Sequence, residues 1–197
     1  MPILRSEIAL YPQDLFALPD LPTPWRVAYV RSRQEKELAR HLLRHGVPYY
    51  LPVAEKQVRR AGRRFVSYLP LFPGYVFFRG AALERRLALA SDRVVSVLEV
   101  SDQALLDGEL HALWRLQESG AAIVPHPYLG PGDEVEVIEG PFRGFSGRVL
   151  REKGRTRLVV SVSFLRQSVA AEFEREALAP MRQVPWVGTW RSRSIAG

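Results

Sequence analysis

Hydrophobic side chains recur with two periods along the chain, and the change of period divides it in two. From residue 24 to residue 120, runs with helix spacing alternate with runs that have strand spacing. Beyond residue 131, apolar residues hold every second position, as at Val135 and Val137, and glycines separate the runs. Period 2 is typical of half-buried strands, and several short strands within about 50 residues form small barrels. The pattern therefore predicts an α+β fold, in which an α/β sandwich is followed by a five-stranded β-barrel.

The first half is expected to follow a β-α-β-β-β-α-β-α order. Trp25 and Tyr29 share one face of a short strand. Ser32 and Glu35 fit a capping box, in which each side chain satisfies the other's backbone amide, and Gly46 ends the helix that follows. The later elements are a strand over 47–52, a hairpin over 55–68 with its tip at Ala61-Gly62, an aromatic strand over 75–79, helices over 81–90 and 106–120, and a strand over 94–100.

Segments outside these patterns set the domain boundaries. Residues 1–23 hold four prolines and no sustained period, so we expect an extended leader. Residues 121–130 have no charged residue and are rich in proline, which is typical of a linker. The two domains are then 24–120 and 131–181, and the tail over 182–197 is expected to be mostly irregular.

The positive charge is concentrated in the first domain. Of the formal net charge of +7, residues 24–120 contribute 16 Lys+Arg against 10 Asp+Glu, a net of +6. Residues 131–180 hold 8 of each, a net of zero. This asymmetry favours different partners for the two domains, the first of them a polyanion. Solubility combined with a general preference for arginine is the alternative explanation.

Several classes of protein are excluded by what the sequence lacks. It holds no cysteine, which excludes a disulfide framework, thiol catalysis and cysteine-bound zinc and fits a reducing cytoplasm. His41 and His45 have metal-ligand spacing without a third ligand nearby, so we expect surface histidines, no metal and no cofactor. No apolar run reaches the ~18 residues of a membrane span, and the N-terminus is not expected to be a secretory signal. A nucleophile elbow and a phosphate-binding loop are also missing, so we do not expect an enzyme.

An aromatic strand is the first candidate for binding. In the run Tyr75-Val-Phe-Phe-Arg79, the side chains of Tyr75, Phe77 and Arg79 share one face. Because that face ends in an arginine, we expect it to be the outer one, with its aromatic side chains exposed at a partner site. The alternative is that these aromatic side chains fill the space between the sheet and its helices.

An arginine-rich hairpin is the second candidate. Its tip is flanked by Arg59, Arg60, Arg63 and Arg64. An extended loop can reach a nucleic-acid backbone, and guanidinium groups pair with phosphates in bidentate geometry. A solvated loop without a ligand is the alternative.

Two motifs resemble a known family. The run Leu71-Phe-Pro-Gly-Tyr-Val-Phe77 and the elements around it resemble the N-terminal (NGN) domain of NusG-type transcription elongation factors. The run from Gly132 to Gly147 is similar to the KOW motif that opens their SH3-like barrel. General NusG proteins carry Ile-Phe-Gly-Arg late in the barrel, whereas this chain has Phe164-Leu-Arg-Gln167. The stretch over 157–173 is instead similar to the specialised UpxY/RfaH-like antiterminators.

The resemblance implies a bacterial, cytoplasmic, monomeric transcription factor without enzymatic activity. Its NGN domain would bind the clamp helices of the RNA polymerase β′ subunit, bridge toward the β subunit and suppress pausing or termination. The polymerase-binding residues implied in this way are Tyr29, Phe72, Tyr75 and Phe77. A housekeeping NusG that couples to Rho or the ribosome, and a ribosome-associated RNA-binding KOW protein, are the alternatives.

The resemblance also implies contacts for the remaining candidates. Arg85 and Arg86 lie where family members approach the non-template DNA strand, and the four hairpin arginines would reach the β subunit or upstream DNA. The barrel would recruit a protein partner, either the ribosomal protein NusE or Rho. Rho is the weaker candidate because the Gly-Arg of general NusG proteins is missing. Its expected contact residues are Phe142, Phe145, Phe164 and Arg166. Phenylalanines that plug the barrel ends are the alternative.

Overall fold

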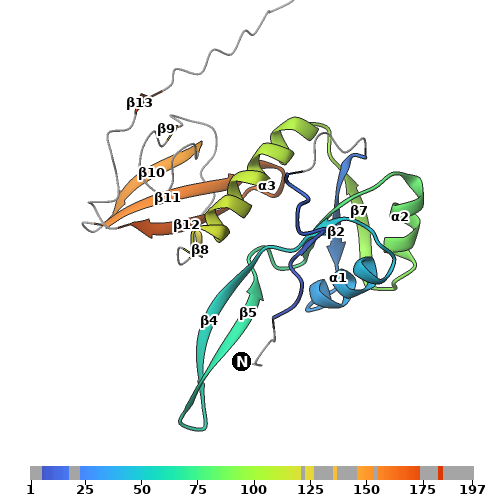
Figure 1. The fold of residues 1–197 in the computed structure, drawn as a ribbon, viewed down its shortest axis with the longest axis horizontal. Coiled ribbons are helices and arrows are strands. Elements are labelled where there is room, and N and C mark those ends of the chain that lie inside the picture. The colour runs from blue at the N-terminus through green and yellow to red at the C-terminus, as the bar shows by residue number, and fades with distance from the viewer. Residues whose placement is uncertain are drawn as a thin grey trace, which may run out of the picture.

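The structure is a computed structural model that describes residues 6–17, 23–120, 123–126, 135–136, 146–152, 155–173 and 182–183. These residues form two antiparallel sheets on either side of one long helix, with a separate two-stranded ribbon (Figure 1). The first sheet has the order β1-β3-β6-β2-β7, the second β13-β9-β10-β11-β12-β8, and the ribbon consists of β4 and β5. The α+β class expected from the sequence is confirmed.

The first domain contains the three helices. They are α1 (Glu35–Arg44), α2 (Ala82–Leu89) and α3 (Gln103–Glu118). Its strands are β1 (Leu10–Tyr11), β2 (Trp25–Val30), β3 (Tyr49–Tyr50), β4 (Val53–Arg60), β5 (Arg63–Pro70), β6 (Tyr75–Arg79) and β7 (Val94–Glu99). The helices and strands expected from the periodicity are therefore present, with bounds shifted by a few residues.

The two faces of the first sheet are covered by different helices. On one face, Ala28, Val76 and Phe78 pack with residues of α1 and α2. On the other face, Val27 and Phe77, which are paired across β2 and β6, pack with the leucines of α3. Leu106, Leu110, Leu113 and Leu116 of that helix are fully buried. The helical stripe expected over 106–117 thus closes the second face.

The start of α1 differs from the expected capping box. The helix begins at Glu35 after Gln34, and the Gln34 side chain makes no capping hydrogen bond. Arg33 has a left-handed backbone (φ 62°), so the chain turns more tightly before the helix than a box at Ser32 requires. The Glu35 carboxylate instead accepts a hydrogen bond from the backbone amide of Gly74 at 2.7 Å. The carboxylate therefore orders a neighbouring turn rather than its own helix.

Part of the expected leader is packed into the first domain. β1 pairs with β3 and extends the sheet by one strand. Leu15 is buried, and the Phe16 ring packs against Trp25, Tyr50, His111 and Trp114, at centroid distances of 5.3–6.0 Å. The expectation of an extended leader is wrong for residues 6–17, because this segment adds a strand to the sheet and packs Leu15 and Phe16 against the core. A two-residue strand and two adjacent apolar residues have no recognisable period in the sequence.

The second domain is all-β in the described residues. Its elements are β8 (Ile123–His126), β9 (Val135–Glu136), β10 (Ser146–Glu152), β11 (Arg155–Val162), the 3-10 turn η1 (Ser163–Leu165), β12 (Gln167–Phe173) and β13 (Arg182–Gln183). β8 falls within the expected linker and β13 within the expected tail. β8 pairs only with β12, at the edge of its sheet, where a proline is tolerated since an edge strand leaves amide positions unpaired.

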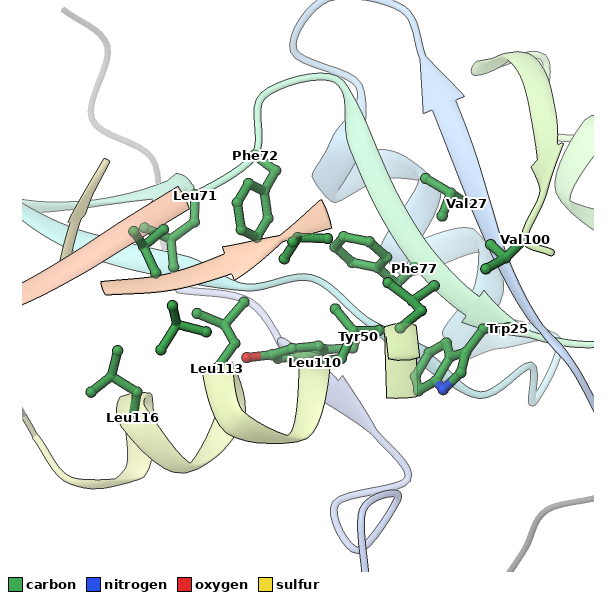
Figure 2. Packing of buried hydrophobic residues seen from close by; sticks show 14 of the residues in the cluster. Trp25, Val27, Tyr50, Leu71, Phe72, Phe77, Val100, Leu110, Leu113 and Leu116 are labelled. Atoms are coloured by element: carbon green, nitrogen blue, oxygen red, sulfur yellow. The ribbon is translucent and has the colours of Figure 1, made fainter. Parts of the chain in front are cut away.

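Helix α3 also contacts the second domain. Leu110, Leu113 and Leu116 of α3 lie in the core cluster shown in Figure 2. Four buried residues of β11 and β12 belong to the same cluster: Val160, Val162, Val169 and Ala171. Both carboxylate oxygens of Glu109 accept the backbone amide of Ser163 at 3.0 Å. One helix therefore supports the first sheet on one side and the barrel strands on the other.

Candidate functional site

Tyr29 and Tyr75 form an exposed aromatic pair on the α3 face of the first sheet. They are direct partners across β2 and β6, and their ring centroids lie 5.4 Å apart. The Tyr29 side chain is 43% exposed, and Tyr75 is half-buried at the margin of the core. Helix α3 covers the face near Val27 and Phe77 but leaves the Tyr29 side chain exposed. The surface defined by Tyr29 and Tyr75 is therefore open to a partner.

A buried acid and a glycine hold this tyrosine pair in place. Gly74 has a φ of +87°, and a Cβ at that position would lie 3.3 Å from the Tyr29 ring. The Gly74 carbonyl accepts the Val30 amide at 2.8 Å, while its own amide donates to buried Glu35. The turn before β6 is therefore fixed to both β2 and α1. This rigid support is what a preformed contact surface requires.

The structure corrects the exposure expected for two other aromatic residues. Phe77 is 0% exposed and Phe72 is 1% exposed. Their rings meet edge to face at a centroid distance of 6.0 Å within the cluster that contains the α3 leucines and the barrel valines (Figure 2). The expectation that Phe77 lies on an outer face is wrong, because α3 covers that end of β6. Both residues are core residues in this arrangement, and for Phe77 this is the alternative that the sequence left open.

The end of that face is fixed by an ion pair. Arg79 pairs with Asp107 of α3 and lies over the Trp25 ring, at 4.6 Å from its centroid. Asp107 also accepts the Trp25 indole N–H at 2.7 Å. The arginine that suggested an outer face is therefore engaged by the covering helix.

Arg85 and Arg86 lie on α2, on the opposite side of the sheet from α3. Arg86 is exposed and Arg85 is partly buried. The start of this helix is tightly built, because Glu84 accepts the Ala81 amide at 2.7 Å and a Cβ on Gly80 would lie only 2.2 Å from the Glu84 Cβ. The two arginines are thus held on a well-defined helix, at a site separate from the tyrosine pair.

The hairpin expected from the sequence is present as β4 and β5. Its turn residues Ala61 and Gly62 both have positive φ, 48° and 74°, which is the backbone of a type I′ turn. Arg59, Arg63 and Arg64 are exposed beside that turn. Within the described residues, no acidic side chain pairs with these three arginines.

Only half of the barrel candidates lie in the described residues. Phe164 is 36% exposed in η1, and Arg166 is exposed just after it with a left-handed φ of 51°. Phe142 and Phe145 lie outside the described residues. The two described candidates therefore share one turn between β11 and β12, next to the Ser163 amide that Glu109 holds.

Two acids whose roles the sequence did not predict organise these surfaces. Glu35 fixes the turn beside the tyrosine pair, and Glu109 joins α3 to the barrel. Glu35 was expected to cap its own helix, and the sequence signal for either acid is a buried leucine three residues away, Leu38 for Glu35 and Leu106 for Glu109. Among the described residues, no group of three His or acidic side chains is arranged to hold a metal ion, and no helix is long and apolar enough to cross a membrane.

Comparison with known proteins identifies the domains. A family model for the transcription termination factor NusG matches residues 23–106, and a KOW-motif model matches residues 131–151. The transcription termination/antitermination protein NusG of Vibrio vulnificus is 31% identical over 155 residues, which cover 73% of this chain and 85% of the relative. The Pseudomonas aeruginosa protein of the same description is 30% identical over 167 residues, covering 76% and 94%. A solved structure on domain interaction in Thermotoga maritima NusG matches at 20% identity with a TM-score of 0.43, covering 76% of this chain and 92% of that one.

A sandwich domain followed by a KOW barrel defines a class of two-domain transcription factors. Given the identity and coverage of its relatives, this chain belongs to the NusG family of transcription termination/antitermination proteins. The resemblance to NusG-type factors noted in the sequence is therefore confirmed.

Proposed function

We propose that this protein is a cytoplasmic transcription elongation and antitermination factor that binds RNA polymerase through its NGN domain. The exposed Tyr29–Tyr75 pair is the observation that carries the proposal. Tyrosines on a rigid sheet provide a large contact area with little loss of conformational entropy, which is typical of interface hot spots. The partner proposed for this pair is the clamp-helix region of the β′ subunit.

The other implied polymerase residues take different roles in this proposal. Phe77 supports the tyrosine pair from within the core, beside Val27. Phe72 lies in the cluster shared with the barrel strands, so polymerase would contact it only after the barrel had moved away from α3. Direct contact is therefore assigned to Tyr29 and Tyr75.

The basic side chains of the NGN domain are proposed to contact nucleic acid. Arg85 and Arg86 on α2 would approach the non-template strand, and the arginines of the β4–β5 hairpin would reach the β subunit or upstream DNA. Two separate basic sites on one domain support binding at an open transcription bubble, where single and double strands lie close together.

The KOW barrel is proposed to recruit a protein partner. Its net charge of zero between residues 131 and 180 does not favour a nucleic-acid backbone. Phe164 and Arg166, together with Phe142 and Phe145, are the proposed contacts. NusE is the preferred partner, and Rho is the weaker one because the Gly-Arg of general NusG proteins is missing.

Within the family we propose a specialised antiterminator of the UpxY/RfaH type. The stretch over 157–173 and Phe164-Leu-Arg-Gln167 support this assignment against a housekeeping NusG. In a reconstituted transcription assay, such a factor should suppress pausing without stimulating Rho-dependent termination. Stimulation of Rho would favour the housekeeping alternative, and binding of ribosomal RNA without polymerase would favour a ribosome-associated KOW protein.

Replacing both tyrosines tests the polymerase assignment. Tyr29→Ala/Tyr75→Ala should weaken polymerase binding by about 2 kcal/mol, roughly 30-fold, if the pair is a hot spot. The control, Ile8→Ala/Leu105→Ala, truncates two other exposed apolar side chains and should bind as the wild type does. A folded tyrosine double variant that binds polymerase with unchanged affinity would rule out this surface.

A further inference from the structure

The outer half of the β4–β5 hairpin is a free-standing ribbon (Figure 1). Its base is packed, since Ser67 is buried and Lys36 of α1 lies 6.0 Å from the centroid of the Tyr68 ring. Over Gln57 to Val66, every described side chain except that of Val58 is exposed. Strands of 8 residues, at about 3.3 Å per residue, give the ribbon a length of about 25 Å. The ribbon therefore presents its tip far from the sheet.

The register of the ribbon brings like charges together. Arg59 is directly opposite Arg64, and Arg60 is directly opposite Arg63. Like charges in direct cross-strand pairs destabilise a sheet. Folding alone does not explain two such pairs in succession at a solvent-exposed tip. A bound polyanion would attract all four arginines and so offset their mutual repulsion.

Strand alternation divides the arginines between the two faces. Arg59 and Arg64 occupy one face by register, and Arg60 and Arg63 occupy the other. The acid closest along the strand, Glu55, is hydrogen-bonded to Tyr68, and that bond raises the pKa of the tyrosine. Both faces of the tip are thus basic, and the one carboxylate of the described ribbon, Glu55, lies near its base.

We propose that this ribbon inserts into the major groove of B-form duplex DNA. Each arginine pair then contacts the phosphates of one of the two strands that border the groove. The inference deepens the nucleic-acid role proposed above for the hairpin, and it rests on that role. The major groove, about 12 Å wide, admits a two-stranded ribbon, whereas the deep and narrow major groove of A-form RNA does not.

The composition of the tip disfavours a single-stranded ligand. Proteins that bind single strands stack successive bases on several aromatic side chains. The outer half of the ribbon offers one aromatic residue, Phe65, which is 36% exposed. Charge on two faces matches two backbones, while one strand would engage only one face.

Binding of the full-length protein to a short labelled DNA duplex, measured without polymerase over a range of salt concentrations, tests the inference. Each phosphate contact contributes about 0.9 to the slope of log K against log salt. Arg59→Gln/Arg64→Gln and Arg60→Gln/Arg63→Gln should therefore each lower the slope by about 1.8. Arg44→Gln/Arg93→Gln removes the same charge from exposed positions elsewhere and should leave the slope unchanged.

Four results would overturn the inference. The first two are an equal loss of salt slope in the Arg44/Arg93 control and a loss of slope from only one of the two arginine pairs. The third is tighter binding of single-stranded DNA or duplex RNA than of duplex DNA. The fourth is displacement of the protein by netropsin, which fills the minor groove. Circular dichroism of each variant checks the fold, and the arginine replacements relieve repulsion rather than remove packing. The polymerase assay with the Tyr29/Tyr75 variant is independent of this experiment, so failure of the hairpin inference and failure of the polymerase assignment are distinguishable.

Discussion

At the scale of single residues, a buried carboxylate determines the geometry of the proposed polymerase surface. Glu35 holds the Gly74 amide, and a Cβ at Gly74 would lie 3.3 Å from the Tyr29 ring. The tyrosine pair therefore depends on a residue of α1 that does not itself reach the surface. The surface is accordingly sensitive to changes behind it.

Replacing Glu35 should disturb this surface. In Glu35→Ala the Gly74 amide loses its acceptor, which costs about 1–3 kcal/mol. Glu35→Gln keeps an acceptor oxygen and should lose clearly less stability. Thermal denaturation measures both effects, and the ring signals of Tyr29 and Tyr75 in NMR spectra report the local change. Equal destabilisation by the two variants would show that the hydrogen bond does not order the turn.

Ala61 carries backbone strain in the hairpin turn. A left-handed backbone costs a residue with a Cβ roughly 1–2 kcal/mol, and glycine avoids most of that cost. Ala61→Gly should therefore slow hydrogen exchange of the β4–β5 amides near the tip. Gly62→Ala adds a second strained residue and should accelerate the exchange. If Ala61→Gly left exchange unchanged or faster, the type I′ assignment would be wrong.

At the scale of elements, local sequence patterns predicted well where the helices and strands lie. They predicted poorly which face of a strand is buried beneath another element. The Trp25 strand, the α3 leucine stripe and the Ala61-Gly62 tip follow from spacing within a few residues. Whether Phe77 is exposed depends instead on α3, which is distant in sequence and crosses the same face. Alternation identifies which side chains share a face but not which face is covered. Phe72 was expected at a binding surface through the family resemblance alone, which carries no information on which residues the barrel strands cover in this chain.

The N-terminal segment shows a second limit of local patterns. Residues 6–17 contain only a two-residue strand, too short for a recognisable period. Their position depends on distant partners: the Tyr49 hydroxyl donates to the Ile8 carbonyl at 2.7 Å, and the Leu51 amide donates to the Ala9 carbonyl at 2.7 Å. Such contacts become visible only once the sheet edge exists. The Glu7–Arg40 ion pair then fastens the segment to α1.

Acid should release this segment. The hydrogen bond from Arg40 lowers the pKa of Glu7 below its ordinary value of 4.5. A lowered folded-state pKa contributes stability that is complete above 4.5 and is lost as the pH falls through the folded-state pKa. Hydrogen exchange of the Leu51 amide should therefore accelerate as the pH falls below about 4.5, after correction for intrinsic rates. In Arg40→Gln exchange should be faster at neutral pH and should lose most of this acid dependence; a retained dependence would point to another titrating group.

At the scale of the whole molecule, α3 couples the NGN domain to the KOW barrel. Its leucines share one buried cluster with Val160 and Val169, and Phe72 belongs to the same cluster. Any partner that requires Phe72 must therefore compete with the barrel strands. The domain arrangement thus bears directly on which aromatic residues polymerase is able to contact.

Glu109 offers a way to weaken this coupling without altering the NGN core. A hydrogen bond to a charged group contributes about 1.5–3 kcal/mol, so Glu109→Ala should shift the balance toward separated domains by roughly tenfold or more. The Ser163 amide should then exchange faster, and NMR relaxation should show the two domains tumbling more independently. Glu118→Ala removes an exposed acid near the end of the same helix and should change neither measurement. Polymerase binding then separates two roles for Phe72. If polymerase contacts Phe72, Glu109→Ala should strengthen polymerase binding, and adding Phe72→Ala should abolish that gain. Unchanged polymerase binding by a variant with separated domains would mean that Phe72 is a core residue alone.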